Sequence, residues 1–376
     1  MPSLHIFLKN KVENMEKLYV DLNENSYDII FESSFDKLSE CMKGINAPKK
    51  MMIITDSNVA PLYSEEVKNV LEKSGYDISI YIFPAGEENK KIEVVMDMCR
   101  ACMSNNLDRK SMIIALGGGV AGDMAGFASA VYMRGIPFVQ IPTTLLSQSD
   151  SSVGGKTGVD FCGGKNIIGA FHQPKMVYIN VNTLKTLPEK EFVSGMGEVI
   201  KHGIIRDKKF FEYVEKNAVK IKSLDADTLI ELSETNCKIK ADVVSEDEKE
   251  SGLRRILNFG HTVGHAVESA FDFTKTHGQC VAFGMISVFK IALDRGLITQ
   301  AELIRLINVL NEYGFETSAV FYDKEKIIEL VHKDKKKDGN NVSFVLSEEI
   351  GSVKIFNDVS DEEIRKSLEY IEENKR

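Results

Sequence analysis

The sequence predicts an α/β fold in two parts, a parallel-sheet part followed by a mainly α-helical part. Over the first 185 residues, short apolar runs alternate with stretches of helical periodicity, which is typical of βαβ units. From residue 186 onward the helical period dominates. A chain of 376 residues is also long for a single hydrophobic core, so we predict two domains, residues 1–185 and 186–376.

The strands expected in the first part are continuous apolar runs. Such runs, without polar alternation, indicate parallel strands that are covered on both faces of the sheet. The expected strands are residues 50–56, 77–83, 111–116 and 138–141, and the expected helices are residues 64–74 and 90–105.

The second part contains six expected helices: residues 187–201, 208–222, 228–246, a run that begins at His261, 281–294 and 299–313. Thr299 with Glu302, and Ser360 with Glu363, have the spacing of capping boxes, which mark helix starts. Residues 342–346 and 352–356 read as a small hairpin. The lysine-rich segment 332–339 reads as a solvated loop.

Composition excludes several classes of protein. The hydrophobic share of 43% and charged share of 27% are those of a globular protein. A net charge of −9 argues against nucleic acid as the main partner. We expect no membrane span and no signal peptide, because neither the chain nor its N-terminus has a long enough apolar run. The six scattered cysteines fit a reducing cytoplasm, and Cys99 and Cys102 read as buried helix thiols.

A glycine-rich loop is the candidate nucleotide site. Gly117, Gly119 and Gly122 match G-x-G-x-x-G between an expected strand and a helix, where backbone amides can hold a pyrophosphate. Twelve of the 27 glycines fall within residues 117–169. The strand that follows does not end in the usual ribose-binding acid, and Asp56, which ends an upstream strand, is a substitute. The alternative is a tight turn that only packs helix on strand.

Three of the seven histidines lie within 17 residues and form the candidate metal site. They are His261, His265 and His277, and Glu198 lies upstream between glycines. A zinc site with an open position takes three protein ligands from His and carboxylate groups. Spacing alone nominates His261 and His265, which lie one helical turn apart. The alternative for any one of them is a hydrogen-bonded core histidine.

Six cations next to glycines or to the metal motifs indicate an anionic small substrate, such as a phosphorylated or carboxylated sugar. They are Lys156, Lys165, Lys201, Lys240, Arg254 and Lys336. For each of them taken alone, a solvated surface position is the alternative.

Taken together, these motifs closely resemble the 3-dehydroquinate synthase family of sugar phosphate cyclases. The resemblance runs from about Asp56 to Phe344. Its segments are Pro84-Ala85-Gly86-Glu87-Glu88-Asn89-Lys90, residues 117–123, Tyr132-Met133-Arg134-Gly135, residues 141–146, residues 150–157, residues 195–201 and residues 257–265.

The resemblance implies an N-terminal Rossmann-like domain that binds NAD, a helical domain that binds zinc (with cobalt as the alternative metal), and an active site in the cleft between them. The implied metal ligands are Glu198, His261 and His277, so that His265 faces the substrate instead. The implied NAD contacts are Asp56, Ala85, Gly86, Glu87, Glu88, Asn89, Lys90, Gly119, Val120, Ala121, Gly122, Asp123, Thr143, Thr144, Lys156, Lys165, Thr183, Leu184, Lys185 and Thr186. The implied catalytic and substrate residues are Arg134, Asp150, Lys156, Asn166, Lys201, Lys240, Arg254, Asn258, His265 and Lys336.

The implied reaction converts 3-deoxy-D-arabino-heptulosonate 7-phosphate to 3-dehydroquinate and phosphate in the shikimate pathway. It proceeds by transient oxidation with NAD, β-elimination of phosphate, re-reduction, ring opening and aldol closure. Arg134 is expected to reach the phosphate site of a neighbouring subunit, which implies a homodimer. The alternatives are another sugar phosphate cyclase, a metal-dependent polyol dehydrogenase, and a catalytically silent regulatory or assembly protein.

Overall fold

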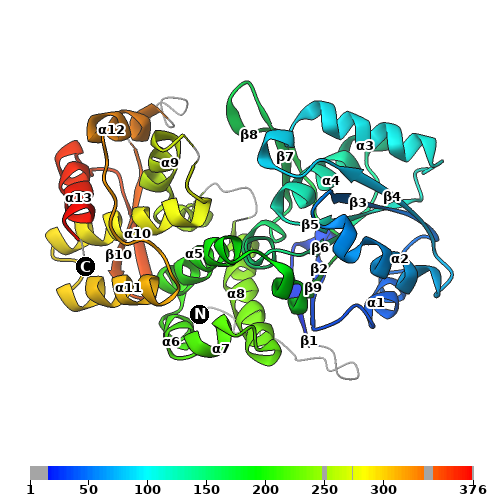
Figure 1. The fold of residues 1–376 in the computed structure, drawn as a ribbon, viewed down its shortest axis with the longest axis horizontal. Helices are drawn as coiled ribbons and strands as arrows, with labels where there is room; N and C mark the ends of the chain where they lie inside the picture. Colours follow the sequence, from blue (N-terminus) through cyan, green and yellow to red (C-terminus); the bar gives the residue numbers. More distant parts are fainter. Residues whose placement is uncertain (1–15, 248–251, 273, 334–341, 375–376) are drawn as a thin grey trace.

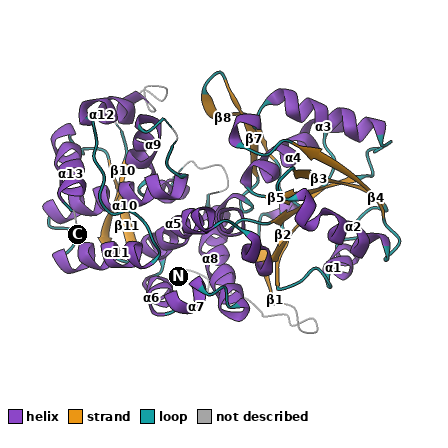
Figure 2. Ribbon diagram, viewed as in Figure 1, coloured by secondary structure: helices purple, strands orange, loops and turns teal. Residues whose placement is uncertain are grey.

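The structure is a computed structural model that describes residues 16–247, 252–272, 274–333 and 342–374. One half of the molecule contains a twisted sheet flanked by helices, and the other half is mainly helical (Figures 1 and 2). This arrangement confirms the predicted fold class.

The main sheet has seven strands in the order β1-β2-β9-β6-β5-β3-β4. All neighbouring pairs are parallel except the edge pair β1–β2. The strands, from one edge to the other, are β1 Glu16–Val20, β2 Tyr27–Glu32, β9 Met176–Asn180, β6 Phe138–Pro142, β5 Met112–Gly117, β3 Lys50–Asp56 and β4 Asp77–Phe83.

Helices cover both faces of this sheet, as the continuous apolar strands predict. Successive residues of β3 point to opposite faces. Met51 and Ile53 join one buried cluster with α1 (Leu38–Gly44) and α2 (Glu65–Glu72). Met52 and Ile54 join another with α3 (Ile92–Ser104) and α4 (Gly119–Val131).

A separate antiparallel hairpin, β7 (Lys156–Phe161) and β8 (Gly164–Phe171), leaves the sheet half and rises between the two halves (Figure 1). Ile168 and Ala170 pack on the cluster under α4. The residues that alternate with them, Ile167 and Phe171, are exposed. The hairpin therefore has one anchored face and one free apolar face.

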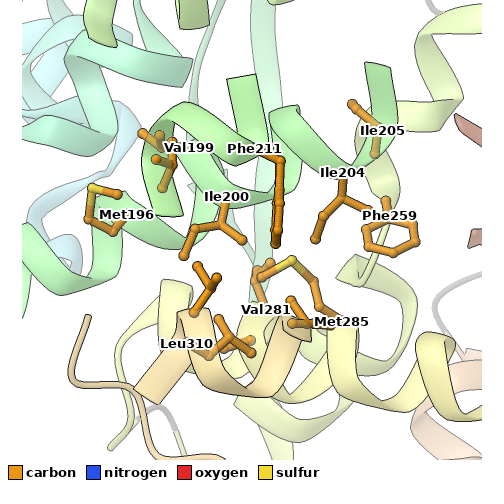
Figure 3. Packing of buried hydrophobic residues seen from close by; sticks show 14 of the residues in the cluster. Met196, Val199, Ile200, Ile204, Ile205, Phe211, Phe259, Val281, Met285 and Leu310 are labelled. Atoms are coloured by element: carbon orange, nitrogen blue, oxygen red, sulfur yellow. The ribbon is translucent and has the colours of Figure 1, made fainter. Parts of the chain in front are cut away.

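The helical half is organised around α10 (His277–Asp294), which is buried along most of its length. Ile200 of α5 (Glu189–Arg206) lies next to Val281 and Met285 of α10 (Figure 3). The other helices are α6 Lys208–Lys216, α7 Ala218–Lys222, α8 Ala226–Glu246, α9 His261–Ala270, α11 Gln300–Glu312, α12 Lys324–Lys333 and α13 Asp361–Glu373, and the hairpin is β10 Phe344–Glu349 with β11 Ser352–Phe356.

One hydrophobic cluster crosses the predicted boundary at residues 185 and 186. It contains Ile29 of β2 and Ile179 of β9 together with Val199 of α5 and Val243 of α8. The two halves are therefore joined by buried apolar contacts next to the sheet edge. None of the helices described here is long and apolar enough to cross a membrane.

The structure differs from the sequence expectations at a few elements. The expected helix 208–222 is two helices, separated at Asn217. The helix expected at 281–294 begins earlier, at His277, where Thr276 accepts a hydrogen bond from the Gln279 amide as its N-cap. Both predicted capping boxes are present. Segment 334–341, most of the expected charged loop, lies outside the described residues.

Candidate active site

A cavity of about 610 Å³ lies between the sheet half, the β7–β8 hairpin and helices α5, α8 and α9. The predicted substrate residues that line it are Asp150, Lys156, Asn166, Lys201, Lys240, Arg254 and Asn258. Asp123 and His261 line it as well. Residues that are distant in sequence therefore meet at one site.

Glu198, His261 and His277 form a group whose potential ligand atoms lie within 4.8 Å of one another. The Nε2 atoms of His261 and His277 lie 3.4 and 3.6 Å from Glu198 Oε1. That oxygen is buried and, among the described residues, has no hydrogen-bond partner. A buried carboxylate oxygen facing two imidazole nitrogens fits a divalent metal such as zinc.

Close helix crossings bring these three side chains together. A Cβ atom on Gly278 would lie 2.0 Å from the carbonyl oxygen of Ser194 in α5. One on Gly284 would lie 1.8 Å from the carbonyl oxygen of Gly260, which precedes α9. Only glycine permits these approaches. As a result, α10 lies close enough to α5 and α9 for His277 and His261 to reach Glu198.

The two histidines of this group differ in protonation. Burial opposes a charge on His277, but Glu198 and Glu268 outweigh it and raise the pKa of His277 to about 9, so a metal there would displace a proton. Burial opposes the charge of Glu198, but the Lys201 ammonium and the His261 and His277 side chains outweigh it and hold the Glu198 pKa well below its usual value. Burial and the charge of Lys201 lower the pKa of His261 to about 3. His261 is therefore neutral at pH 7, the form that binds metal.

His265 lies next to this group, one turn along α9. Its ring centroid is 5.2 Å from that of His261 and 5.8 Å from that of His277. With Glu268 and His277 it forms a second, overlapping group of potential ligands. The pair that spacing nominates, His261 and His265, has adjacent rings on one helix, but the two histidines do not belong to one group of potential ligands among the described residues.

Two lysines on the cavity wall, Lys201 and Lys240, form ion pairs. Lys201 donates to Glu198 Oε2, and Lys240 Nζ lies 2.6 Å from Asp150 Oδ1. Burial opposes ionisation of Asp150, but Lys240 is the largest opposing influence and the pKa of Asp150 stays below its usual value. Arg254 is a third buried cation, with Nη2 3.4 Å from the Gly154 carbonyl oxygen.

His202 is a buried residue of this site that sequence reasoning missed. Its Nδ1 lies 2.9 Å from Asn236 Oδ1, and its Nε2 lies 3.8 Å from Asp150 Oδ1. Burial and Lys201 lower the pKa of His202 to about 4. In the sequence, the available signal is that His202 directly follows segment 195–201, which contains Glu198 and Lys201. Glu268, one turn after His265, was missed as well.

The glycine loop has the geometry predicted for it. Strand β5 ends at Gly117 and α4 begins at Gly119, at the carboxyl edge of the sheet where nucleotides bind in such folds. Asp56 ends the adjacent strand β3. A Cβ atom on Gly117 would lie 3.3 Å from Asp56 Oδ2, so the substitute acid lies directly beside the loop.

Most of the remaining predicted nucleotide contacts gather at the same edge, whereas Lys156 and Lys165 lie on the β7–β8 hairpin and Lys165 contacts Glu268 of α9. Ala85 to Asn89 follow β4, Thr143 and Thr144 follow β6, and Thr183 to Thr186 follow β9. Lys90 is buried and donates to both Asp123 and Asn166, at 2.6 Å each. Gln148 donates to the carbonyl oxygens of Pro142 and Asn180, which holds the ends of β6 and β9 together.

Among the described residues, two predicted substrate residues, Arg134 and His265, do not line this cavity. Arg134 is exposed beyond the end of α4, in a left-handed conformation with φ of 68°. Its expected role concerns a neighbouring subunit and stays a prediction. Lys336 lies outside the described residues. Cys99 and Cys102 lie on α3 as free thiols; Cys102 is buried as expected, whereas Cys99 is only partly buried.

Comparison with known proteins identifies the family. The family model for the 3-dehydroquinate synthase N-terminal region matches residues 80–194, and the model for the C-terminal region matches residues 195–337. A 3-dehydroquinate synthase from Acetivibrio thermocellus is 48% identical over 332 residues, covering 88% of this chain and 92% of that protein.

Two solved structures have the same overall fold. A 2-epi-5-epi-valiolone synthase from Streptomyces hygroscopicus, with NAD⁺ and Zn²⁺ bound, superposes with a TM-score of 0.86 at 26% identity, covering 93% of this chain and 97% of that one. A 2-deoxy-scyllo-inosose synthase complexed with carbaglucose-6-phosphate, NAD⁺ and Co²⁺ gives a TM-score of 0.83 at 26% identity, covering 94% and 99%. With two family models matching most of its length and a relative of this identity, the chain belongs to the 3-dehydroquinate synthase family.

Proposed function

We propose that this chain is a 3-dehydroquinate synthase, a phosphate-eliminating carbon–oxygen lyase. Its substrate is 3-deoxy-D-arabino-heptulosonate 7-phosphate, and its products are 3-dehydroquinate and phosphate. The observation that carries the proposal is one cavity that combines His261 of the candidate metal group with the buried cations Lys201, Lys240 and Arg254. The glycine loop of the sheet half contributes Asp123 to the same cavity.

Glu198, His261 and His277 would hold zinc, with cobalt as the alternative. The carboxyl edge of the sheet around Asp56 and the loop at Gly119 would hold NAD. When bound, zinc would polarise the substrate hydroxyls and NAD would accept a hydride and later return it, so the reaction has no net oxidation.

The residues of the chain would bind and orient the substrate. Arg254 and Lys240 suit its carboxylate, because a guanidinium and an ammonium in a buried site form strong charge-assisted hydrogen bonds. Fixing that end favours the intramolecular aldol closure. Lys156 suits the phosphate, together with Lys336 and with Arg134 of a neighbouring subunit.

His265 is assigned to proton transfer, since it is exposed beside the metal group. Asp150, Asn166 and Asn258 line the cavity and would contact the sugar hydroxyls. Lys201 also lines the cavity and would contact the substrate.

The predicted domains 1–185 and 186–376, a homodimer and a cytoplasmic location complete the proposal. The homodimer follows from the role assigned to Arg134, which is exposed beyond α4. Light scattering combined with size exclusion would measure the mass of the assembly, and a monomer of 42.0 kDa would remove the basis for sharing Arg134.

The test is to incubate the chain with zinc, NAD and the heptulosonate phosphate and to follow phosphate and dehydroquinate together. We expect equal amounts of both products and no accumulation of NADH. Absence of phosphate release would overturn the proposal. Stoichiometric NADH would instead indicate a polyol dehydrogenase.

The same assay with a sugar phosphate that lacks the carboxylate tests the neighbouring cyclase activities. The buried cations Arg254 and Lys240 on the cavity wall favour a carboxylated substrate, because hydrogen bonds from cationic groups to a carboxylate are strong. Equal turnover of the two substrates would contradict this specificity.

A further inference from the structure

The carboxylate of Glu268 lies on the opposite ring nitrogen of His277 from the metal group. Nε2 of His277 is 3.6 Å from Glu198, whereas Nδ1 is 3.8 Å from Glu268 Oε2. The side chain of Glu268 is 7% exposed. A nearly buried carboxylate is therefore directed at the nitrogen that the candidate metal would leave free.

His261 has an equivalent arrangement with a different partner. Its Nδ1 lies 3.1 Å from the carbonyl oxygen of Phe259, while its Nε2 faces Glu198. A metal-binding histidine almost always donates its second N–H to a carboxylate or a carbonyl, which fixes the ring and its tautomer. Each candidate histidine ligand thus has an acceptor behind it.

Glu268 is in turn held from the other half of the molecule. Lys165 Nζ, at the start of strand β8, lies 2.9 Å from Glu268 Oε1. The two oxygens of Glu268 therefore face different partners, Lys165 with Oε1 and His277 with Oε2. The ion pair between Lys165 and Glu268 connects the β7–β8 hairpin to α9, next to the candidate metal ligand His277.

We propose that Glu268 is a positioning residue for the metal ligand His277, and that Lys165 holds Glu268 in that orientation. This inference rests on the metal site of the proposed function. The β7–β8 hairpin would then support the metal site, and metal affinity would depend on Lys165, a residue of the sheet half.

The test uses Glu268→Gln, which keeps the size of the side chain and removes its charge. Lys165→Met removes the cation alone. Glu312→Gln is the control, because Glu312 forms a surface pair with Lys222 away from this site. Cobalt affinity is measured on each folded chain by competition with a chelator, and the visible spectrum of bound cobalt reports the ligand geometry.

We expect Glu268→Gln to weaken cobalt binding by about 10- to 100-fold and to shift the spectrum, as loss of such a partner does at other metal sites. Lys165→Met should give a smaller loss, and the control none. A purely structural role would lower the melting temperature without changing the affinity of the folded chain, and that result would overturn the proposal.

Two further outcomes are decisive. If the wild-type chain binds two cobalt ions and Glu268→Gln binds one, Glu268 is itself a ligand in the group with His265 and His277, and the positioning role is wrong. If Lys165→Met binds cobalt like the wild type, the part assigned to Lys165 is wrong. None of these measurements uses substrate, so failure of the proposed reaction would be seen separately.

Discussion

Replacing Lys240 with methionine tests the buried charge pair on the wall of the cavity. Lys240 lies on α8 with its side chain 6% exposed, and its ammonium is 2.6 Å from Asp150 Oδ1. It also donates to the backbone carbonyl of Asp150. Methionine fills the same volume without a charge, so the variant leaves the carboxylate of Asp150 without its nearest cation.

The expected loss of stability follows from the burial of the two partners. Removing one member of a buried ion pair costs about 3–5 kcal/mol. The side chain of Asp150 is 29% exposed, so water still solvates part of its charge. Lys201 also lowers the pKa of Asp150 and remains in the variant. We therefore expect the free energy of unfolding to fall by roughly 2–3 kcal/mol, below or at the low end of that range.

The assay is urea denaturation followed by circular dichroism, for Lys240→Met, Asp150→Asn and the double variant. The double variant no longer contains a stranded carboxylate. We expect it to be more stable than the sum of the single effects by roughly 2 kcal/mol. Lys238→Met is the control, since Lys238 is an exposed lysine of the same helix.

Kinetics of the carboxylated substrate complete the test. Loss of a hydrogen bond to a charged group costs about 1.5–3 kcal/mol, which corresponds to a roughly 10- to 150-fold fall in kcat/KM. Additive stability effects in the double variant would refute the energetic coupling of the pair. Unchanged kcat/KM would refute the contact between Lys240 and the substrate carboxylate.

Three further variants test other parts of the reasoning. His261→Ala should lose metal and activity together, and stoichiometric zinc in the purified variant would exclude His261 as a ligand. Arg254→Ala should lower kcat/KM for the carboxylated substrate by about tenfold or more, and unchanged kinetics would contradict the clamp. Glu363 pairs with Arg295, which lowers the pKa of Glu363 to about 2. Stabilisation from a depressed carboxyl pKa is fully present above the unfolded pKa near 4.5 and is lost progressively as pH falls through the folded pKa. Glu363→Gln should therefore lower the melting temperature most at pH 7, less at pH 3 and hardly at pH 2 or below.

Local signals predicted the strands β3, β4, β5 and β6 of the sheet half, whereas β1, β2 and β9 were missed. Apolar strands such as β3 and β5 are continuous in sequence, and the turn at Gly117 lies between its own strand and helix. The ends of parallel strands share one edge, so the position of Asp56 next to Gly117 also followed from the pattern. The β7–β8 hairpin was missed, because only one of its faces is buried and its glycines read as a ligand loop.

The metal group could not be derived from spacing alone. Spacing relates His261 to His265, which lie on one helix, but His277 and Glu198 come from two other helices. Their meeting depends on close crossings at Gly278 and Gly284, which no local pattern shows. Resemblance to the family supplied the ligand set, and the structure brings those three side chains together.

The two carboxylate oxygens of Glu198 face different cations, the Lys201 ammonium and the candidate metal. Its Oε2 accepts from Lys201, while Oε1 faces the two imidazoles and has no hydrogen-bond partner among the described residues. A metal at Oε1 would not compete with Lys201 for the same oxygen, but the two positive charges would repel across a buried carboxylate. That repulsion lowers the cost of moving the Lys201 ammonium toward an anionic substrate in the adjoining cavity. Metal binding would thus prepare Lys201 for the substrate without any change of fold.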